Sequence, residues 1–187
     1  MLFRSRVQTL GADPNYSSEI VLAYLLLAEQ YQSKPTIVPI PETVTEVRSD
    51  TDATLIINTS VPEESENDRS LDLIDVWQDV YELPYVFAVC VCYEESFSDE
   101  ELQLFSKVGN TVQQILSDYS KRDEFDNLEF SQMKNNHEYC LNFTYSFGEY
   151  ELEALKEFYR LAYYYGLIAD IPEIREYHPL GHSFSIN

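Results

Sequence analysis

The sequence predicts an α/β protein with a mostly parallel sheet. Short β-rich runs alternate with longer segments of helical periodicity, and one later run, Leu83–Cys92, is continuously apolar. Alternating strands and helices typically form a parallel sheet with helices on its faces, and strands covered on both faces are apolar throughout. The chain has 187 residues, of which 44% are hydrophobic, so it can form one domain or two small lobes.

The first 60 residues or so show strand and helix signals in turn. Apolar residues recur at helical spacing after a Gly-Ala-Asp-Pro-Asn turn, and the β-rich runs beside this segment are bounded by proline and polar residues. We expect a strand over Arg6–Leu10, a helix from about Asn15 to Tyr31, and strands over Thr36–Ile40 and Ala53–Asn58.

The remaining residues carry further helical patterns and the apolar run. Two Ser-x-x-Glu sequences, Ser98 with Glu101 and Ser146 with Glu149, are typical of capping boxes at helix starts. In chain order we expect a helix over Asp72–Tyr81, a strand over Leu83–Cys92, a helix from Ser98 to about Ile115, helix with loop over Lys121–Glu138, and a helix from Ser146 that ends at Gly166.

The run Leu83–Cys92 predicts a strand that is buried on both faces. Cys90 and Cys92 alternate along it and point to one face, where we expect buried core thiols rather than a redox or zinc pair. One strand cannot form a sheet alone, so this strand must join strands from elsewhere.

The turn over Leu10–Ser18 is the best candidate for a ligand site. A strand followed by a short loop and a helix start presents unpaired N–H groups and the positive end of the helix dipole. Asn15, Ser17 and Ser18 add side-chain donors, so the turn could hold a carboxylate or a phosphate. Asp13 before Pro14 is a good helix cap, and Ser17 or Ser18 is the alternative cap. An ordinary capped helix with no ligand remains the other interpretation.

Charge and cysteine content limit the partners and the compartment. The formal net charge is −21, which argues against nucleic acid and anionic membranes and requires any anion site to be built locally. Three cysteines, no secretion signal and no membrane-length apolar run predict a cytoplasmic protein. His178 and His182 are separated by Pro179 and Gly181, so we expect no metal and no cofactor.

Three stretches together are similar to one known family. They are Asp72–Trp77 followed by Leu83–Val89, the opening Ala12–Ser18, and Tyr145–Glu149 through Phe158 to Gly166. In this spacing they resemble chorismate dehydratase, the menaquinone-biosynthesis enzyme of the futalosine route, more than its relative dihydroxynaphthoate synthase. The resemblance covers nearly all of the chain and about the last two-thirds of the family.

The resemblance implies a type II periplasmic-binding-protein-like fold of two α/β lobes, with the N-terminal part of the first lobe missing. Residues 1–83 would be the inserted second lobe, and residues 84–187 the crossover strand and C-terminal helical part of the first lobe. Family residues for catalysis would then precede Met1, so none can be named. A separate N-terminal segment or a homodimer would complete the protein.

The implied function is elimination of water from chorismate, which gives 3-(1-carboxyvinyloxy)benzoate. A chorismate-like carboxylate would contact Asn15, Ser17, Ser18, Asn58 and Thr59, with Ser18 at the usual family threonine. The family has Gly-Asp where this chain has Asn58-Thr59, and the loss of glycine removes a close backbone approach. The alternative function is a non-catalytic anion-binding, small-molecule-binding or interaction domain derived from the same fold.

Overall fold

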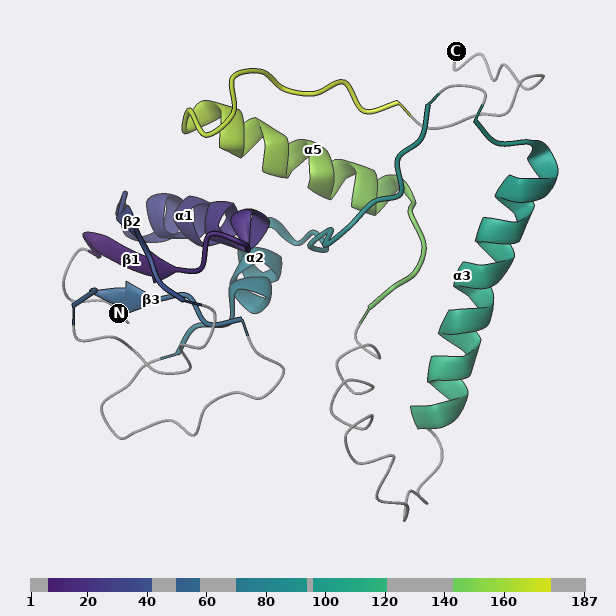
Figure 1. The fold of residues 1–187 in the computed structure, drawn as a ribbon, viewed down its shortest axis with the longest axis horizontal. Helices are drawn as coiled ribbons and strands as arrows, with labels where there is room; N and C mark the ends of the chain where they lie inside the picture. Colours follow the sequence, from purple (N-terminus) through teal and green to yellow (C-terminus); the bar gives the residue numbers. More distant parts are fainter. Residues whose placement is uncertain (1–6, 42–49, 58–69, 94–95, 121–142, 176–187) are drawn as a thin grey trace. The chain divides into compact units, whose positions relative to one another are not determined.

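The computed structural model describes residues 7–41, 50–57, 70–93, 96–120 and 143–175, which Figure 1 draws as coloured ribbon. The chain divides into two compact units. The first comprises Met1–Val86 and Tyr150–Pro172, and the second comprises Phe87–Glu149 and Glu173–Asn187. The assignment of residues 1–83 and 84–187 to two lobes of a family fold stays a prediction.

The first unit contains a parallel sheet of three short strands, as the α/β class predicts. The strands are β1 (Thr9–Ala12), β2 (Thr36–Pro39) and β3 (Ala53–Thr54), in the order β2-β1-β3. Leu10 of the central strand pairs with Ile37 on one side and with Ala53 on the other. The predicted β2 is confirmed to within one residue, whereas β1 begins and ends later than predicted and β3 is only two residues long.

The late start of β1 has a local cause. The carboxylate of Asp52 accepts the backbone N–H groups of Gln8 and Thr9, at 2.8 and 2.9 Å, and the Thr9 hydroxyl at 3.1 Å. The Asp52 N–H donates in return to the Thr9 hydroxyl oxygen, at 2.9 Å. These donors also hold the pKa of Asp52 below its ordinary value. The Asp52 side chain therefore accepts the backbone N–H groups at the start of β1, which a neighbouring strand would otherwise accept.

Helix α1 (Ser17–Tyr31) is the centre of the first unit because it is buried on two faces. Ala23 and Leu27 pack with Val7 and Leu10 beside the sheet. The opposite side of the helix contributes Leu22, Leu25 and Leu26 to a second cluster with Trp77 and Leu161. Burial on both sides explains why the sequence of α1 is apolar around most of its circumference.

Helix α2 (Leu73–Tyr81) confirms the predicted helix and its start. The Asp72 carboxylate accepts the N–H groups of Ile74 and Asp75, at 2.8 and 3.3 Å, so it caps the first turn. Trp77 has no exposed surface, and its indole Nε1–H donates to the backbone oxygen of Pro84 at 3.2 Å. This bond fixes the chain that leaves α2 against the core.

Helix α5 (Glu149–Tyr164) packs on the same core through Leu161 and Phe158. The helix ends as predicted: Gly166 has φ +71°, its N–H donates to Tyr163, and the N–H of Leu167 donates to Ala162. This pair of bonds is a Schellman motif, which requires a left-handed residue. The predicted second capping box is wrong in register, because Glu149 is the first residue of the helix and not the third.

The predicted strand over Leu83–Cys92 is wrong for this structure. No residue of this run pairs within the described sheet, and the residues from Phe87 to Cys92 are exposed, with Val91 82% exposed. Cys90 and Cys92 are exposed thiols rather than the buried core thiols that we expected. A doubly covered strand needs a neighbour on each side, and the described residues of the chain provide neither.

The second unit contains the described helix α3 (Asp99–Ser120). Its predicted capping box is confirmed: the N–H and hydroxyl of Ser98 donate to the Glu101 carboxylate at 2.8 and 2.9 Å. These bonds hold the pKa of Glu101 below its ordinary value.

The predicted helix with loop over Lys121–Glu138 lies outside the described residues. Within the described ranges, no helix combines the length and the apolar character that a membrane span needs.

Candidate functional site

The site begins at the carboxyl ends of the three strands. The N–H of Ile40 donates to Ala12 at 3.0 Å, and the N–H of Leu55 donates to Gly11 at 2.8 Å, so the chains after β2 and β3 stay close to β1. A Cβ atom on Gly11 would lie 3.3 Å from side chains of Ile40 and Thr51, which is why glycine suits this position. Ligands of open α/β sheets bind outside this edge.

A tight turn links β1 to α1. The backbone N–H of Asn15 donates to Oδ1 of Asp13 at 2.9 Å, and the N–H of Tyr16 donates to the Asp13 carbonyl at 3.1 Å. Pro14 has no N–H, so the first one available to the Asp13 carboxylate is that of Asn15. The expectation that Asp13 caps the helix, with Pro14 as its first residue, is therefore wrong: Asp13 closes the turn before α1.

The first turn of α1 has no side-chain cap. The N-cap residue is Tyr16, which makes no capping hydrogen bond with its side chain, so neither Ser17 nor Ser18 is the cap. The first bond within the helix runs from the Ile20 N–H to the Tyr16 carbonyl, at 3.0 Å. The N–H groups of Ser17, Ser18 and Glu19 therefore have no acceptor inside the helix. They lie at the positive end of the helix dipole.

Asp13 is the residue of this turn whose structural role the sequence analysis assigned wrongly. Its side chain is only 9% exposed, and its Oδ2 atom is buried with no hydrogen-bond partner in the part of the chain that the structure describes. A buried carboxylate oxygen without a donor is unfavourable, since it has lost its water and gained nothing. The signal available in the sequence was Asp-Pro-Asn after a strand, which is typical of a turn closed by the aspartate side chain.

The structure brings three of the predicted site residues together. Asn15, Ser17 and Ser18 are exposed and lie at the start of α1, while Asn58 and Thr59 lie outside the described residues. The backbone N–H of Asn15 already binds Asp13, so only its side chain is available to a ligand. The predicted roles of all five residues in binding stay predictions.

A hollow of about 680 Å³ lies at the other end of α1, beside the amino ends of β1 and β2. The Lys34 ammonium lies 5.1 Å from the centre of the Tyr165 ring. The residues that line the hollow are Val7, Gln8, Ala28, Gln32, Ser33, Lys34, Thr36, Tyr164 and Tyr165. Because this is the carbonyl end of α1, its dipole disfavours an anionic ligand here.

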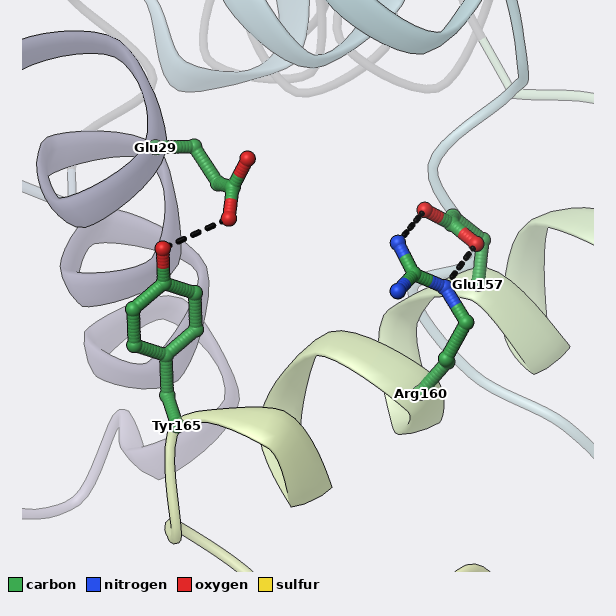
Figure 2. A network of polar contacts seen from close by, with 4 residues as sticks. All are labelled: Glu29, Glu157, Arg160 and Tyr165. Carbon is green, nitrogen blue, oxygen red and sulfur yellow. Dashed lines mark hydrogen bonds and ion pairs between the residues drawn. The ribbon is translucent and has the colours of Figure 1, made fainter.

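The acidic side chain of Glu29 adds to the negative potential near that hollow. The Tyr165 hydroxyl donates to Glu29 at 2.6 Å, and Arg160 forms a two-point ion pair with Glu157 at 2.6 and 2.7 Å (Figure 2). The bond to Glu29, followed by burial, raises the pKa of Tyr165 to about 12. Burial, with Glu29 and Glu157 nearby, raises the pKa of Tyr81 to about 12 as well. An anion is therefore better placed at the start of α1.

Metal binding has no support from the described ranges, in which no group of three or more His, Cys, Asp or Glu residues is arranged to hold an ion. His178 and His182, whose spacing the sequence analysis considered, lie outside those ranges. The polar groups that the described residues offer at the start of α1 are backbone N–H groups, hydroxyls and the Asp13 carboxylate.

Comparison with known proteins decides the family. The model of the family described as menaquinone biosynthesis matches residues 2–164, which is most of the chain. The chain belongs to the menaquinone biosynthesis family. A search of curated proteins finds no match. The region shared with the menaquinone biosynthesis family includes the turn at Asp13, all of α1 and α2, and α5 to its last residue. The resemblance noted in the sequence is thus confirmed at the level of the family.

Proposed function

We propose that this chain acts as a chorismate-dehydratase-like lyase of menaquinone biosynthesis, which removes water from chorismate to give 3-(1-carboxyvinyloxy)benzoate. Membership of the family supports the pathway. The observation that carries the site is the uncapped start of α1 at the carboxyl edge of β1, with the hydroxyl-bearing Ser17 and Ser18 exposed there. Chorismate has two carboxylates, and one of them would accept the N–H groups of this turn.

Charge supports the same placement. A protein with a net charge of −21 repels a dianion unless a local group attracts it. Three N–H groups at a helix start supply that attraction without a cationic side chain. Loss of water makes the ring of chorismate aromatic, so the elimination is downhill. The protein then needs mainly to orient the dianion and to assist one proton transfer.

The architecture that we propose is the two-lobe, periplasmic-binding-protein-like fold of type II. In this proposal residues 1–83 form the inserted lobe, and residues 84–187 form the segment that crosses back and the C-terminal helical part of the first lobe. The exposure of the run from Phe87 to Cys92 supports the idea that its sheet neighbours are supplied by a separate N-terminal segment or a second copy. The exposed thiols of Cys90 and Cys92 support a reducing, cytoplasmic compartment.

The deciding experiment incubates the purified chain with chorismate, with and without an N-terminal segment taken from a chorismate dehydratase, and follows the aromatic product by liquid chromatography. We expect turnover only when the segment is present, because the family residues for catalysis lie in it. Absence of product in both reactions would contradict the enzymatic proposal.

A matched pair of variants tests the binding residue. Ser18→Ala removes one hydroxyl at the start of α1, and the expected loss in chorismate affinity is roughly tenfold, the effect of one hydrogen bond to a charged group. Gln30→Ala changes an exposed residue near the other end of the same helix and should leave affinity unchanged. Equal affinities for Ser18→Ala and Gln30→Ala would remove Ser18 from the site.

One observation favours the second candidate, a non-catalytic anion-binding or interaction domain. Glu19 lies in the first turn of α1, where its carboxylate weakens the attraction for a ligand anion. Chorismate binding without turnover, even with the segment supplied, would support this function over the lyase.

A further inference from the structure

The hollow at the carbonyl end of α1 combines the features of a site for an organic cation. Its volume of about 680 Å³ is that of a small-molecule site. Helix α1 ends beside it: Gln32 is left-handed at φ 50°, and the N–H groups of Gln32 and Ser33 both donate to the Leu27 carbonyl. The negative end of the helix dipole therefore lies here, and Glu29 in the last turn adds a carboxylate.

Two tyrosine rings form an open corner of the hollow. The ring planes of Tyr164 and Tyr165 are perpendicular, with centroids 5.1 Å apart, and both residues line the hollow. The Tyr165 hydroxyl donates to the Glu29 carboxylate (Figure 2), and a hydrogen bond to an anion polarises the phenol and makes its ring more electron-rich. The faces of electron-rich rings attract cations, and aromatic walls of this kind hold alkylammonium groups.

A cation already lies at this corner. The Lys34 ammonium is 5.1 Å from the centre of the Tyr165 ring, which is the distance of a cation–π contact. Among the described residues that line the hollow, Lys34 is the only cationic one. Lys34 is exposed, so its flexible side chain can leave the ring for water at little cost. The ring therefore attracts an alkylammonium group that another cation can displace.

We propose that this hollow binds a small alkylammonium ligand, whose cationic group takes the place of the Lys34 ammonium over the Tyr165 ring. Val7 and Ala28, which also line the hollow, offer apolar contact to the alkyl part of such a ligand. The net charge of −21 raises the concentration of cations around the whole chain. This site lies at the opposite end of α1 from the carboxylate site proposed above and does not depend on it.

Choline and 3,3-dimethyl-1-butanol are the probes, because they have the same shape and only choline carries a charge. Titrations of the ¹⁵N-labelled full chain, at constant ionic strength, follow the amide signals of Ser33, Lys34 and Tyr165. We expect choline to bind about fivefold more tightly than the alcohol, which is the effect of one cation–π contact at an exposed site.

Lys34→Gln tests the competition. This variant removes the resident cation and its repulsion of the ligand, so choline should bind about fivefold more tightly than to the parent. Lys107→Gln, at an exposed position of α3, is the control because it changes the net charge of the chain by the same amount. Its affinity for choline should equal that of the parent.

Tyr165→Leu tests the ring. The preference for choline over the alcohol should disappear in this variant and persist in the control Tyr163→Leu, which changes a 51% exposed residue of the same helix. Tyr165→Phe keeps the ring and loses only the bond to Glu29, so it should retain a preference for choline even if Tyr165→Leu fails to fold. The fluorescence of the buried Trp77 shows whether each variant is folded.

Three results would overturn the proposal. Equal affinities of the parent for choline and the alcohol would show that the hollow does not recognise a cation. A preference that persists in Tyr165→Leu, or equal effects of Lys34→Gln and Lys107→Gln, would show only the general attraction of a cation to an acidic chain. Each result leaves the chorismate proposal untouched, since that site is tested by its own ligand and by Ser18→Ala.

Discussion

Replacement of Leu161 by alanine tests the packing of α5 on α1 and α2, which is the contact that completes the core of the first unit. Leu161 is 2% exposed and belongs to the cluster of Leu22, Leu25, Leu26 and Trp77. Removing a fully buried leucine side chain costs the transfer free energy of its methyl groups and leaves a cavity. The expected loss in the free energy of unfolding is about 2–5 kcal/mol.

Trp77 provides the assay because it is the only tryptophan of the chain and is completely buried in the same cluster. Its fluorescence therefore reports on the unfolding of this core in a urea titration. With a slope of about 2 kcal/mol per molar urea, the predicted loss lowers the midpoint by roughly 1–2.5 M. The slope itself should stay constant, because the surface exposed on unfolding is nearly unchanged.

Tyr163→Ala is the control on the same helix. Tyr163 is 51% exposed, so its truncation should change the free energy of unfolding by no more than about 0.5 kcal/mol. If Leu161→Ala shifts the midpoint no further than Tyr163→Ala does, α5 does not pack on this core and the description of the first unit is wrong.

Three other changes have definite outcomes. Asp72→Ala removes the acceptor for Ile74 and Asp75 and should cost about 1 kcal/mol in the same urea assay, whereas no loss would show that the cap is unimportant. Gly166→Ala places a Cβ at φ +71° and should cost about 1–2 kcal/mol; a neutral result would contradict the left-handed helix end. The pKa of Asp52 is lowered by its bonds to Gln8 and Thr9, so its stabilising effect is present above the ordinary value of 3.8 and is lost as the pH falls through the lower, folded-state value. The melting temperature of the parent should accordingly fall more steeply with acid than that of Asp52→Asn, and parallel curves between about pH 2 and pH 6 would refute the role of this carboxylate.

Features that depend on neighbouring residues in sequence were the ones that could be predicted. Asp72 and the pair Ser98 with Glu101 start helices because a short side chain reaches N–H groups two or three residues away. Gly166 ends a helix because only glycine adopts the left-handed conformation without strain. Each of these signals is complete within about four residues, so the rest of the fold does not change it.

The run Leu83–Cys92 shows why the remaining features could not be predicted. Its composition is that of a buried strand, but composition states a preference for burial and does not supply the neighbours that would bury it. Strand pairing is a contact between distant parts of a chain or between chains, and the described residues contain no partner for this run. β3 begins at Ala53 as predicted but ends at Thr54, because its pairing with β1 extends no further than Gly11, and the β-rich sequence does not show where a pairing ends.

The candidate site combines both situations. The sequence pattern located the turn and its exposed donors, Asn15, Ser17 and Ser18, because a strand followed by Gly-Ala-Asp-Pro-Asn and a helix is a local signal. It assigned Asp13 the ordinary task of a cap, since the pattern does not show whether a carboxylate oxygen is buried. Burial of an atom is a property of the whole fold, so four neighbouring residues predict the turn and its hydrogen bond to Asn15 but not the environment of the other carboxylate oxygen.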